Sequence, residues 1–163
     1  MRFVFYCLIF LSFVFTGCLK KNDDCPYSVA KIVAPVSEEM AVADYLSTNG
    51  ITAIKHASNL YYEIVQPGAG AAPGQCSGIM VKYSGKLTNG NVFDSQNSTI
   101  FTLGTLIEGW KMALPLIKKG GQIRLYIPPS LGYKNVDVTN AGVVVIPANS
   151  ILIFDITLTD VYE

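Results

Sequence analysis

The side chains that could take part in chemistry are few, and most of them are aromatic. His56 is the only histidine among the 163 residues, and the four cysteines are not accompanied by the further ligands that a zinc site requires. A zinc enzyme and a Ser-His-Asp hydrolase are therefore disfavoured. Aromatic and aliphatic side chains are plentiful in the second half of the chain instead. They could line an apolar binding site, and no acid–base pair is evident.

The charge balance narrows the range of partners. Twelve basic and twelve acidic residues give a formal net charge of zero, and the only basic clusters are the pairs 20–21 and 118–119. Such a surface has no field that would attract nucleic acid, so we expect no nucleic-acid binding. Half of the residues are hydrophobic, which is enough for one domain with a real core and an N-terminal extension.

The N-terminus has the pattern of a bacterial lipoprotein signal. Residues 1–17 hold an apolar run from 3 to 15, too short for a bilayer span of about 20 residues but typical of a signal peptide. Two small residues and Cys18 follow, as in a lipobox, although Phe15 stands where Leu is usual. We expect acylated Cys18 to anchor the protein on a membrane of the cell envelope, with the domain in the periplasm or at the cell surface. A short transmembrane anchor and a signal cleaved elsewhere are the alternatives.

Residues 18–36 have no periodicity and are predicted to form a tether. Its acidic pair at 23–24 fits a solvated linker, or a sorting signal for the cell surface. Cys25 and Cys76 would lie in an oxidising compartment, where a disulfide is permitted. A bridge between them and two free thiols both remain open, because sequence does not give the distance between their Cα atoms.

A short helix should follow the tether. Ser37 is a suitable N-cap, Glu38 and Glu39 favour the first turn, and Asn49-Gly50 is a typical helix end. We therefore predict a helix over 37–48 within a helical extension that spans 37–58.

The remainder of the chain, residues 59–163, alternates like an antiparallel sheet. Asn89-Gly90 lies in a predicted hairpin turn, a polar loop is expected over 95–99, and Pro115 falls within the only helix-like run, 110–118. The predicted strands are 60–65, 79–87, 92–94, 101–103, 122–127 and 151–161. The fold class is α+β, a strongly curved antiparallel sheet wrapped around one short helix.

Seven blocks of this region resemble the FKBP-type peptidyl-prolyl cis-trans isomerases in order and spacing. They are 81–85, 90–95, 101–104, 106–110, 119–121, 127–133 and 146–155. The resemblance covers roughly residues 59–163 and implies a peptidyl-prolyl isomerase that assists folding of secreted or envelope proteins. Its partners would be Pro-containing polypeptides, and it would need no cofactor and no metal.

The resemblance also implies a role for each pocket residue. Trp110 would form the floor under the prolyl ring, and Asp94, held by Tyr83, would lie beside the twisting carbonyl. The backbone N–H of Ile107 and the hydroxyl of Tyr133 would donate to carbonyls of the bound peptide. The other substrate-binding residues would be Phe93, Phe101 and Phe154 in the walls, with Leu106 and Ile146 at the rim. Each aromatic residue taken alone fits an ordinary core position equally well.

Three departures from the family pattern stand out. Thr99 replaces an aromatic residue, Lys134 replaces a glycine, and the segment 135–145 is rich in valine where the family has a Gly/Pro-rich flap. They leave two alternatives to an active isomerase: a low-turnover chaperone that binds Pro-containing peptides, and a surface lipoprotein that keeps the fold but has lost the pocket.

Overall fold

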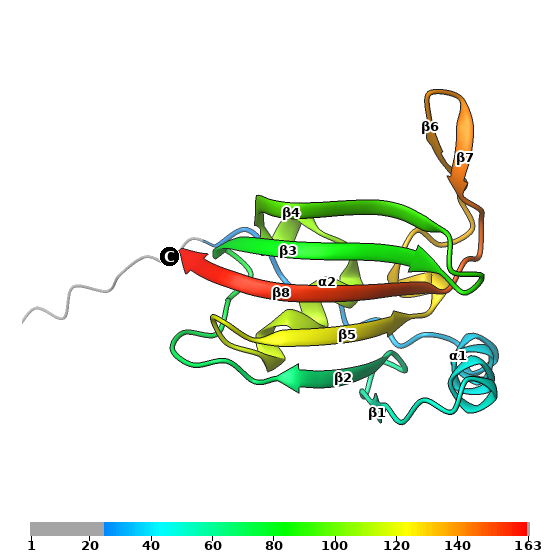
Figure 1. Ribbon diagram of the computed structural model, residues 1–163, viewed down its shortest axis with the longest axis horizontal. Helices are drawn as coiled ribbons and strands as arrows, with labels where there is room; N and C mark the ends of the chain where they lie inside the picture. The colour runs from blue at the N-terminus through cyan, green and yellow to red at the C-terminus, as the bar shows by residue number, and fades with distance from the viewer. Residues whose placement is uncertain (1–24, 163) are drawn as a thin grey trace, which may run out of the picture.

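The computed structural model describes residues 25–162. Cys18 and the predicted signal peptide lie outside this range. Six strands form one antiparallel sheet in the order β1-β2-β5-β8-β3-β4, and a two-stranded hairpin, β6–β7, extends away from it (Figure 1). The strands are β1 (Ile54–Lys55), β2 (Tyr61–Gln66), β3 (Gly78–Leu87), β4 (Val92–Thr102), β5 (Gln122–Ile127), β6 (Val138–Asn140), β7 (Val143–Ile146) and β8 (Leu152–Tyr162). The predicted α+β class is confirmed.

The main core lies between the sheet and the short helix α2 (Glu108–Ala113). Alternate residues of β3, β5 and β8 point to this face, among them Val81, Leu125 and Leu152, and all three are fully buried. Three 3₁₀ turns complete the layer: η1 (Leu103–Thr105), η2 (Leu114–Leu116) and η3 (Pro129–Leu131). The sheet therefore supplies a rigid support for whatever α2 and the loops present.

The helix α1 (Val36–Thr48) confirms the helix predicted over 37–48. It buries Val42 and Leu46 against Tyr126 and Ile153, whose side chains lie on the sheet face opposite the main core. The predicted helical extension is helical only as far as Thr48, because Gly50 takes a φ of +65° and turns the chain out of the helix. Among residues 25–162, no helix has the length and hydropathy needed to span a membrane.

The end of the predicted tether packs against the domain instead of standing free. Cys25 is bonded to Cys76, with the two Cα atoms 5.7 Å apart. Ala34 is buried, its N–H donates to Ser58 O at 3.0 Å, and its carbonyl accepts from Asn59 Nδ2 at 2.8 Å. Residues 25–35 are therefore part of the folded unit, since covalent and backbone bonds hold both ends of the segment.

Two further expectations are wrong. The polar segment 95–99 is not a loop, because β4 continues through it as the edge strand, with the side chains of 95–98 exposed and Thr99 half-buried. The helix-like run 110–118 is divided: α2 ends at Ala113 and η2 follows, with Pro115 in the first turn of η2. Proline has no N–H to continue an α-helix and is tolerated at the start of a new turn.

Candidate active site: an aromatic pocket beside α2

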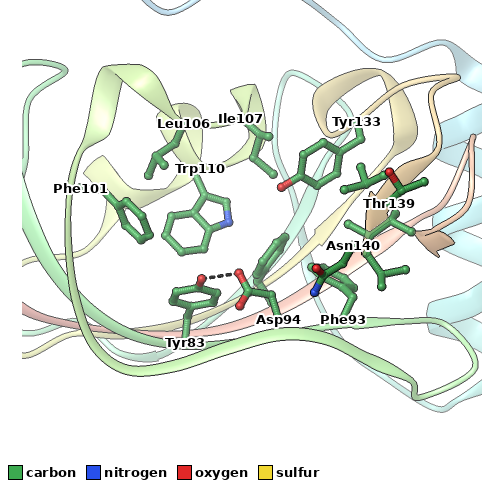
Figure 2. Close-up of a pocket in the computed structure, with 14 residues that line it drawn as sticks. Tyr83, Phe93, Asp94, Phe101, Leu106, Ile107, Trp110, Tyr133, Thr139 and Asn140 are labelled. Atoms are coloured by element: carbon green, nitrogen blue, oxygen red, sulfur yellow. Dashed lines mark hydrogen bonds between the residues drawn. The ribbon is translucent and has the colours of Figure 1, made fainter. Parts of the chain in front are cut away.

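A cavity of about 400 Å³ opens between α2, the β3–β4 pair and the β6–β7 hairpin (Figure 2). Its wall contains all ten residues that the sequence assigns to the site. These are Tyr83, Phe93, Asp94, Phe101, Leu106, Ile107, Trp110, Tyr133, Ile146 and Phe154. The structure thus brings together side chains from six separate segments between 83 and 154.

Trp110 forms the floor of this cavity. The indole is only 4% exposed and meets the rings of Phe154 and Tyr83 edge to face, with centroids 5.2 Å and 5.4 Å away. Such T-shaped contacts direct the positive edge of one ring at the negative face of the next. Gly109 allows α2 to lie this close to the sheet, because a Cβ there would be 2.7 Å from Ile127 Cδ1. The floor is therefore fixed by its neighbours.

The wall next to the floor depends on Gly85 of β3. Gly85 pairs with Asp94 of β4 on one side and with Phe154 of β8 on the other. A Cβ on Gly85 would lie 2.6 Å from the Phe93 ring and 2.7 Å from the Phe154 ring. The missing side chain is what allows the two rings to pack edge to face across the strand, 5.5 Å apart.

Asp94 is held in place by Tyr83. The Tyr83 hydroxyl donates to Asp94 Oδ2 at 2.5 Å (Figure 2). Burial, and then the hydrogen bond to the Asp94 carboxylate, raise the pKa of Tyr83 above its usual value. Tyr83 therefore stays protonated and continues to donate to Asp94 throughout the physiological range.

Hydrogen-bond donors without partners face the same cavity. Trp110 Nε1 is buried and has no acceptor among residues 25–162, and Figure 2 shows it turned toward the open space. The backbone N–H of Ile107, just before α2, likewise has no acceptor in the described part of the chain. The Tyr133 hydroxyl points into the pocket, and burial followed by the charge of Asp94 raises its pKa. These groups can bind carbonyl oxygens of a ligand.

The site has little capacity for other chemistry. Among residues 25–162 there is no group of three His, Cys, Asp or Glu side chains placed to hold a metal ion. His56 lies outside the pocket, where its Nδ1 is 2.8 Å from Ser58 Oγ. What the arrangement can do is bind an apolar group against Trp110 and orient the carbonyls beside it.

Four pocket residues were missed from the sequence: Val138, Thr139, Asn140 and Val145. All belong to the β6–β7 hairpin, which covers one side of the opening. Its turn takes positive φ at Ala141 (+48°) and Gly142 (+82°), as two-residue hairpin turns require. The alternating Val138-Thr139-Asn140 and the glycine were the available signals, but Ala141 is an uncommon residue at positive φ and weakens them.

Comparisons with known proteins agree on one family. The sequence profile of the FKBP-type peptidyl-prolyl cis-trans isomerases matches residues 70–159. The FKBP-type peptidyl-prolyl cis-trans isomerase FkpA of Escherichia coli (strain K12) is 42% identical over 108 residues, covering 64% of this chain and 38% of the relative. A probable FKBP-type isomerase of Haemophilus influenzae is 43% identical, also over 108 residues, covering 64% of this chain and 43% of the relative. The chain thus spans about two-fifths of the length of these relatives.

Solved structures give the same result. The crystal structure of FkpA from Escherichia coli superposes with a TM-score of 0.67 at 35% identity, covering 78% of this chain and 61% of that one. A peptidyl-prolyl cis-trans isomerase from Pseudomonas syringae also has a TM-score of 0.67, at 25% identity, with 80% of this chain and 98% of that one covered.

Proposed function

Because this chain belongs to the family of FKBP-type peptidyl-prolyl cis-trans isomerases, we propose that its aromatic pocket catalyses rotation about X-Pro peptide bonds. The substrates are polypeptides that fold in the cell envelope. The observation that supports this most strongly is the pocket itself: an open apolar cavity on an indole floor, lined by N–H donors that have no acceptor among residues 25–162.

The barrier explains why such a pocket suffices. Rotation about a peptide bond costs about 18–20 kcal/mol because the twisted form loses amide resonance. The twisted amide also has less charge separation than the planar one, so water stabilises it less. A dry pocket that prefers the twisted form to both planar forms lowers the barrier without any bond being broken. Aromatic walls and a buried floor suit this task better than an acid–base pair.

The residues then divide the work. The prolyl ring packs on Trp110 and between Phe154 and Phe93, which fixes one side of the rotating bond. The Ile107 N–H and the Tyr133 O–H donate hydrogen bonds to carbonyls of the peptide on either side of the proline. These bonds fix the direction in which the peptide lies. Asp94, oriented by Tyr83, acts on the rotating carbonyl through its charge. No proton needs to move.

A second function, a binding module with little turnover, is favoured by the unusual hairpin and by Thr99 and Lys134. Isomerisation of a proline tetrapeptide distinguishes the two. We expect the protein to bring the tetrapeptide to cis–trans equilibrium in a time far shorter than the tens to hundreds of seconds of the uncatalysed reaction. If the protein binds the tetrapeptide saturably but isomerisation proceeds at the uncatalysed rate, the enzyme function is refuted and the binding module is supported.

We also propose that the protein is exported and lipid-anchored. The apolar N-terminal run ending in Cys18 supports this, and so does the disulfide between Cys25 and Cys76, since such bonds persist in oxidising compartments. Of the tether predicted over 18–36, residues 25–35 lie against the domain, and residues 18–24 are outside the described range. Replacing Cys18 with serine should release the protein from membranes into the soluble fraction; a Cys18→Ser protein that stays membrane-bound would refute the anchor.

A further inference from the structure

The edge of the pocket that carries the Ile107 N–H leads directly into α2. This helix has six residues, too few for its own backbone hydrogen bonds to fix its position. Aromatic contacts with Tyr83 and Phe154 hold the Trp110 indole. The direction of the Ile107 N–H depends instead on the main chain of the first turn of α2, and so on what that turn contacts.

Glu108, the first residue of α2, binds two donors at once. Its Oε1 is ion-paired with Lys111 Nζ, one turn further along α2, and its Oε2 accepts a hydrogen bond from the Ala30 N–H at 3.3 Å. The side chains of Glu108 and Lys111 are only 19% and 11% exposed, so water competes little for either bond. A carboxylate suits this place because it can accept from both partners and has no donor of its own.

Ala30 belongs to residues 25–35, the segment that we call the strap. One end of the strap is held covalently by the disulfide between Cys25 and Cys76. Near its other end Ala34 is buried and hydrogen-bonded to the domain. Ala30 lies between these two fixed points, so its N–H gives the first turn of α2 an anchor outside the helix.

The chain before Ile107 is held by the same strap. Gly104 of η1 lies so close to Tyr27 of the strap that a Cβ on the glycine would overlap with the tyrosine. The Gly104 N–H also donates to Gln75 O at 2.7 Å. Ile107 therefore lies between two points that contact the strap, η1 before it and Glu108 after it.

We propose that Glu108 is a positioning residue for isomerisation: by bonding the strap to α2, it holds the Ile107 N–H in the direction of the carbonyl that this N–H binds. The inference rests on the isomerase function proposed above. Glu108 is not part of the pocket wall, so it acts through Ile107 and not on the substrate. Loss of the strap bond should weaken one hydrogen bond to the peptide, which raises KM and leaves kcat unchanged.

The test must remove the strap bond without leaving a buried charge, because an unpaired charge would itself destabilise the protein. E108M/K111M removes both charges and the acceptor for the Ala30 N–H. E108Q/K111M also removes both charges, but the amide oxygen of glutamine can still accept from Ala30. E39M/K55M is the matched control where α1 meets the sheet, since Glu39 is 14% exposed and also accepts from two donors.

Cis–trans kinetics on a Leu-Pro tetrapeptide separate KM from kcat. We expect E108M/K111M to raise KM about fivefold at the wild-type kcat, as the weakening of one hydrogen bond would. E108Q/K111M and E39M/K55M should keep the wild-type value of both constants.

Nuclear magnetic resonance locates the change. Adding the tetrapeptide should move the Ile107 N–H resonance downfield, because that N–H then gains an acceptor. We expect a smaller movement in E108M/K111M than in the wild type and in E108Q/K111M. Trp110 is the only tryptophan of the chain, so its single indole N–H resonance reports the pocket floor and should respond to the peptide equally in all three proteins.

Equal KM values for E108M/K111M and E108Q/K111M would overturn the proposal. A lower kcat at unchanged KM in E108M/K111M would do so too, because that pattern indicates a general loss of active protein. If E108M/K111M does not fold, E108Q takes its place, because one amide oxygen cannot accept from Ala30 and Lys111 together. E108Q should then raise KM and E108Q/K111M should restore it; an unchanged KM in E108Q refutes the role of Glu108.

Failure of the isomerase function would be seen separately, as a wild type that turns over no tetrapeptide. The Ile107 resonance then decides the role of Glu108. A smaller peptide-induced movement in E108M/K111M than in E108Q/K111M supports it, and equal movements refute it.

Discussion

Two tyrosine–carboxylate pairs lie on opposite faces of the same sheet. On the pocket side, Tyr83 donates to Asp94; on the other, Tyr61 donates to Glu39 of α1. Glu39 is also paired with Lys55, 3.1 Å from Nζ to Oε1, and the next turns of α1 bury Val42 and Leu46. Asp94 has no cation within ion-pair distance among residues 25–162 and faces a cavity instead.

The difference shows what surroundings do to one kind of hydrogen bond. At the α1 contact the carboxylate is compensated and the space around the helix is filled, so the pair contributes to stability. In the pocket the same pair leaves a charge beside an open apolar space, where it can act on a bound dipole. Substitutions at α1 should therefore alter stability alone, and those in the pocket should alter mainly activity.

The largest expected effect is on stability. Leu46→Ala removes a side chain that is 5% exposed between α1 and the sheet, and should lower the free energy of unfolding by about 2–4 kcal/mol. Chemical denaturation measures the loss, and kcat/KM per folded molecule should stay at the wild-type value. A fall in kcat/KM would mean that α1 influences the pocket.

Trp110→Leu should show the reverse pattern. It keeps apolar bulk at the floor but removes the flat surface for the prolyl ring, so kcat/KM on a tetrapeptide should fall roughly 30-fold, equivalent to about 2 kcal/mol. Because Trp110 borders an existing cavity, Trp110→Leu should lower the free energy of unfolding by less than Leu46→Ala does. The proposed difference between the two faces is contradicted if Trp110→Leu unfolds most of the protein while the molecules that stay folded keep the wild-type kcat/KM.

The two pairs can be compared by the same change. Tyr83→Phe and Tyr61→Phe each delete one hydroxyl, worth about 1 kcal/mol. Tyr83→Phe should lower kcat/KM about fivefold, because Asp94 loses its orientation. Tyr61→Phe should lower the unfolding free energy by about 1 kcal/mol and leave kcat/KM intact. Identical profiles for the two variants would contradict the division of roles.

The smallest effect is the pH dependence of the α1 contact. Burial, and then the hydrogen bond to Glu39, raise the pKa of Tyr61 to about 12 from the ordinary 10. The folded state therefore holds this proton more tightly, and its stabilisation is present below pH 10 and lost as the pH rises toward 12. The hydrogen bond from Tyr61, and then Lys55, lower the pKa of Glu39, so its stabilisation is present above pH 4.5 and lost as the pH falls below its depressed pKa.

Thermal unfolding of wild type and Tyr61→Phe across both ranges measures this. The difference between them should shrink between pH 10 and about 12. Taking the difference removes the contributions of Tyr83 and Tyr126, whose pKa values are also raised. A difference that does not vary with pH would show that the Tyr61 proton is not linked to folding.

The sequence predicted the pocket better than the loops around it. Trp110, Phe154 and Tyr83 lie in blocks whose order and spacing are typical of the family, and a buried aromatic site leaves little freedom for these positions. The middle of the edge strand β4, between the strands predicted over 92–94 and 101–103, was missed because Ser95 to Ser98 are exposed and have the composition of a loop. Edge strands need only half of their hydrogen bonds, so polar composition does not exclude them.

The other features that the sequence did not predict depend on contacts between residues far apart in the chain. Nothing in the local sequence of 25–35 indicates that Ala34 is buried or that Cys25 lies next to Cys76, since both depend on residues far along the chain. Asn140 and Val145 line the pocket only because of the direction in which the β6–β7 hairpin leaves the core at Ile146. Local patterns predict elements, whereas these features arise from how the elements pack.

The central claim is that the Trp110 pocket interconverts the cis and trans forms of a prolyl bond. Exchange spectroscopy on a Leu-Pro peptide with substoichiometric protein observes that interconversion directly. We predict cross-peaks between the cis and trans resonances that grow with protein concentration and that Trp110→Leu largely removes. Cross-peaks absent with the wild-type protein, or equally strong with Trp110→Leu, would contradict it.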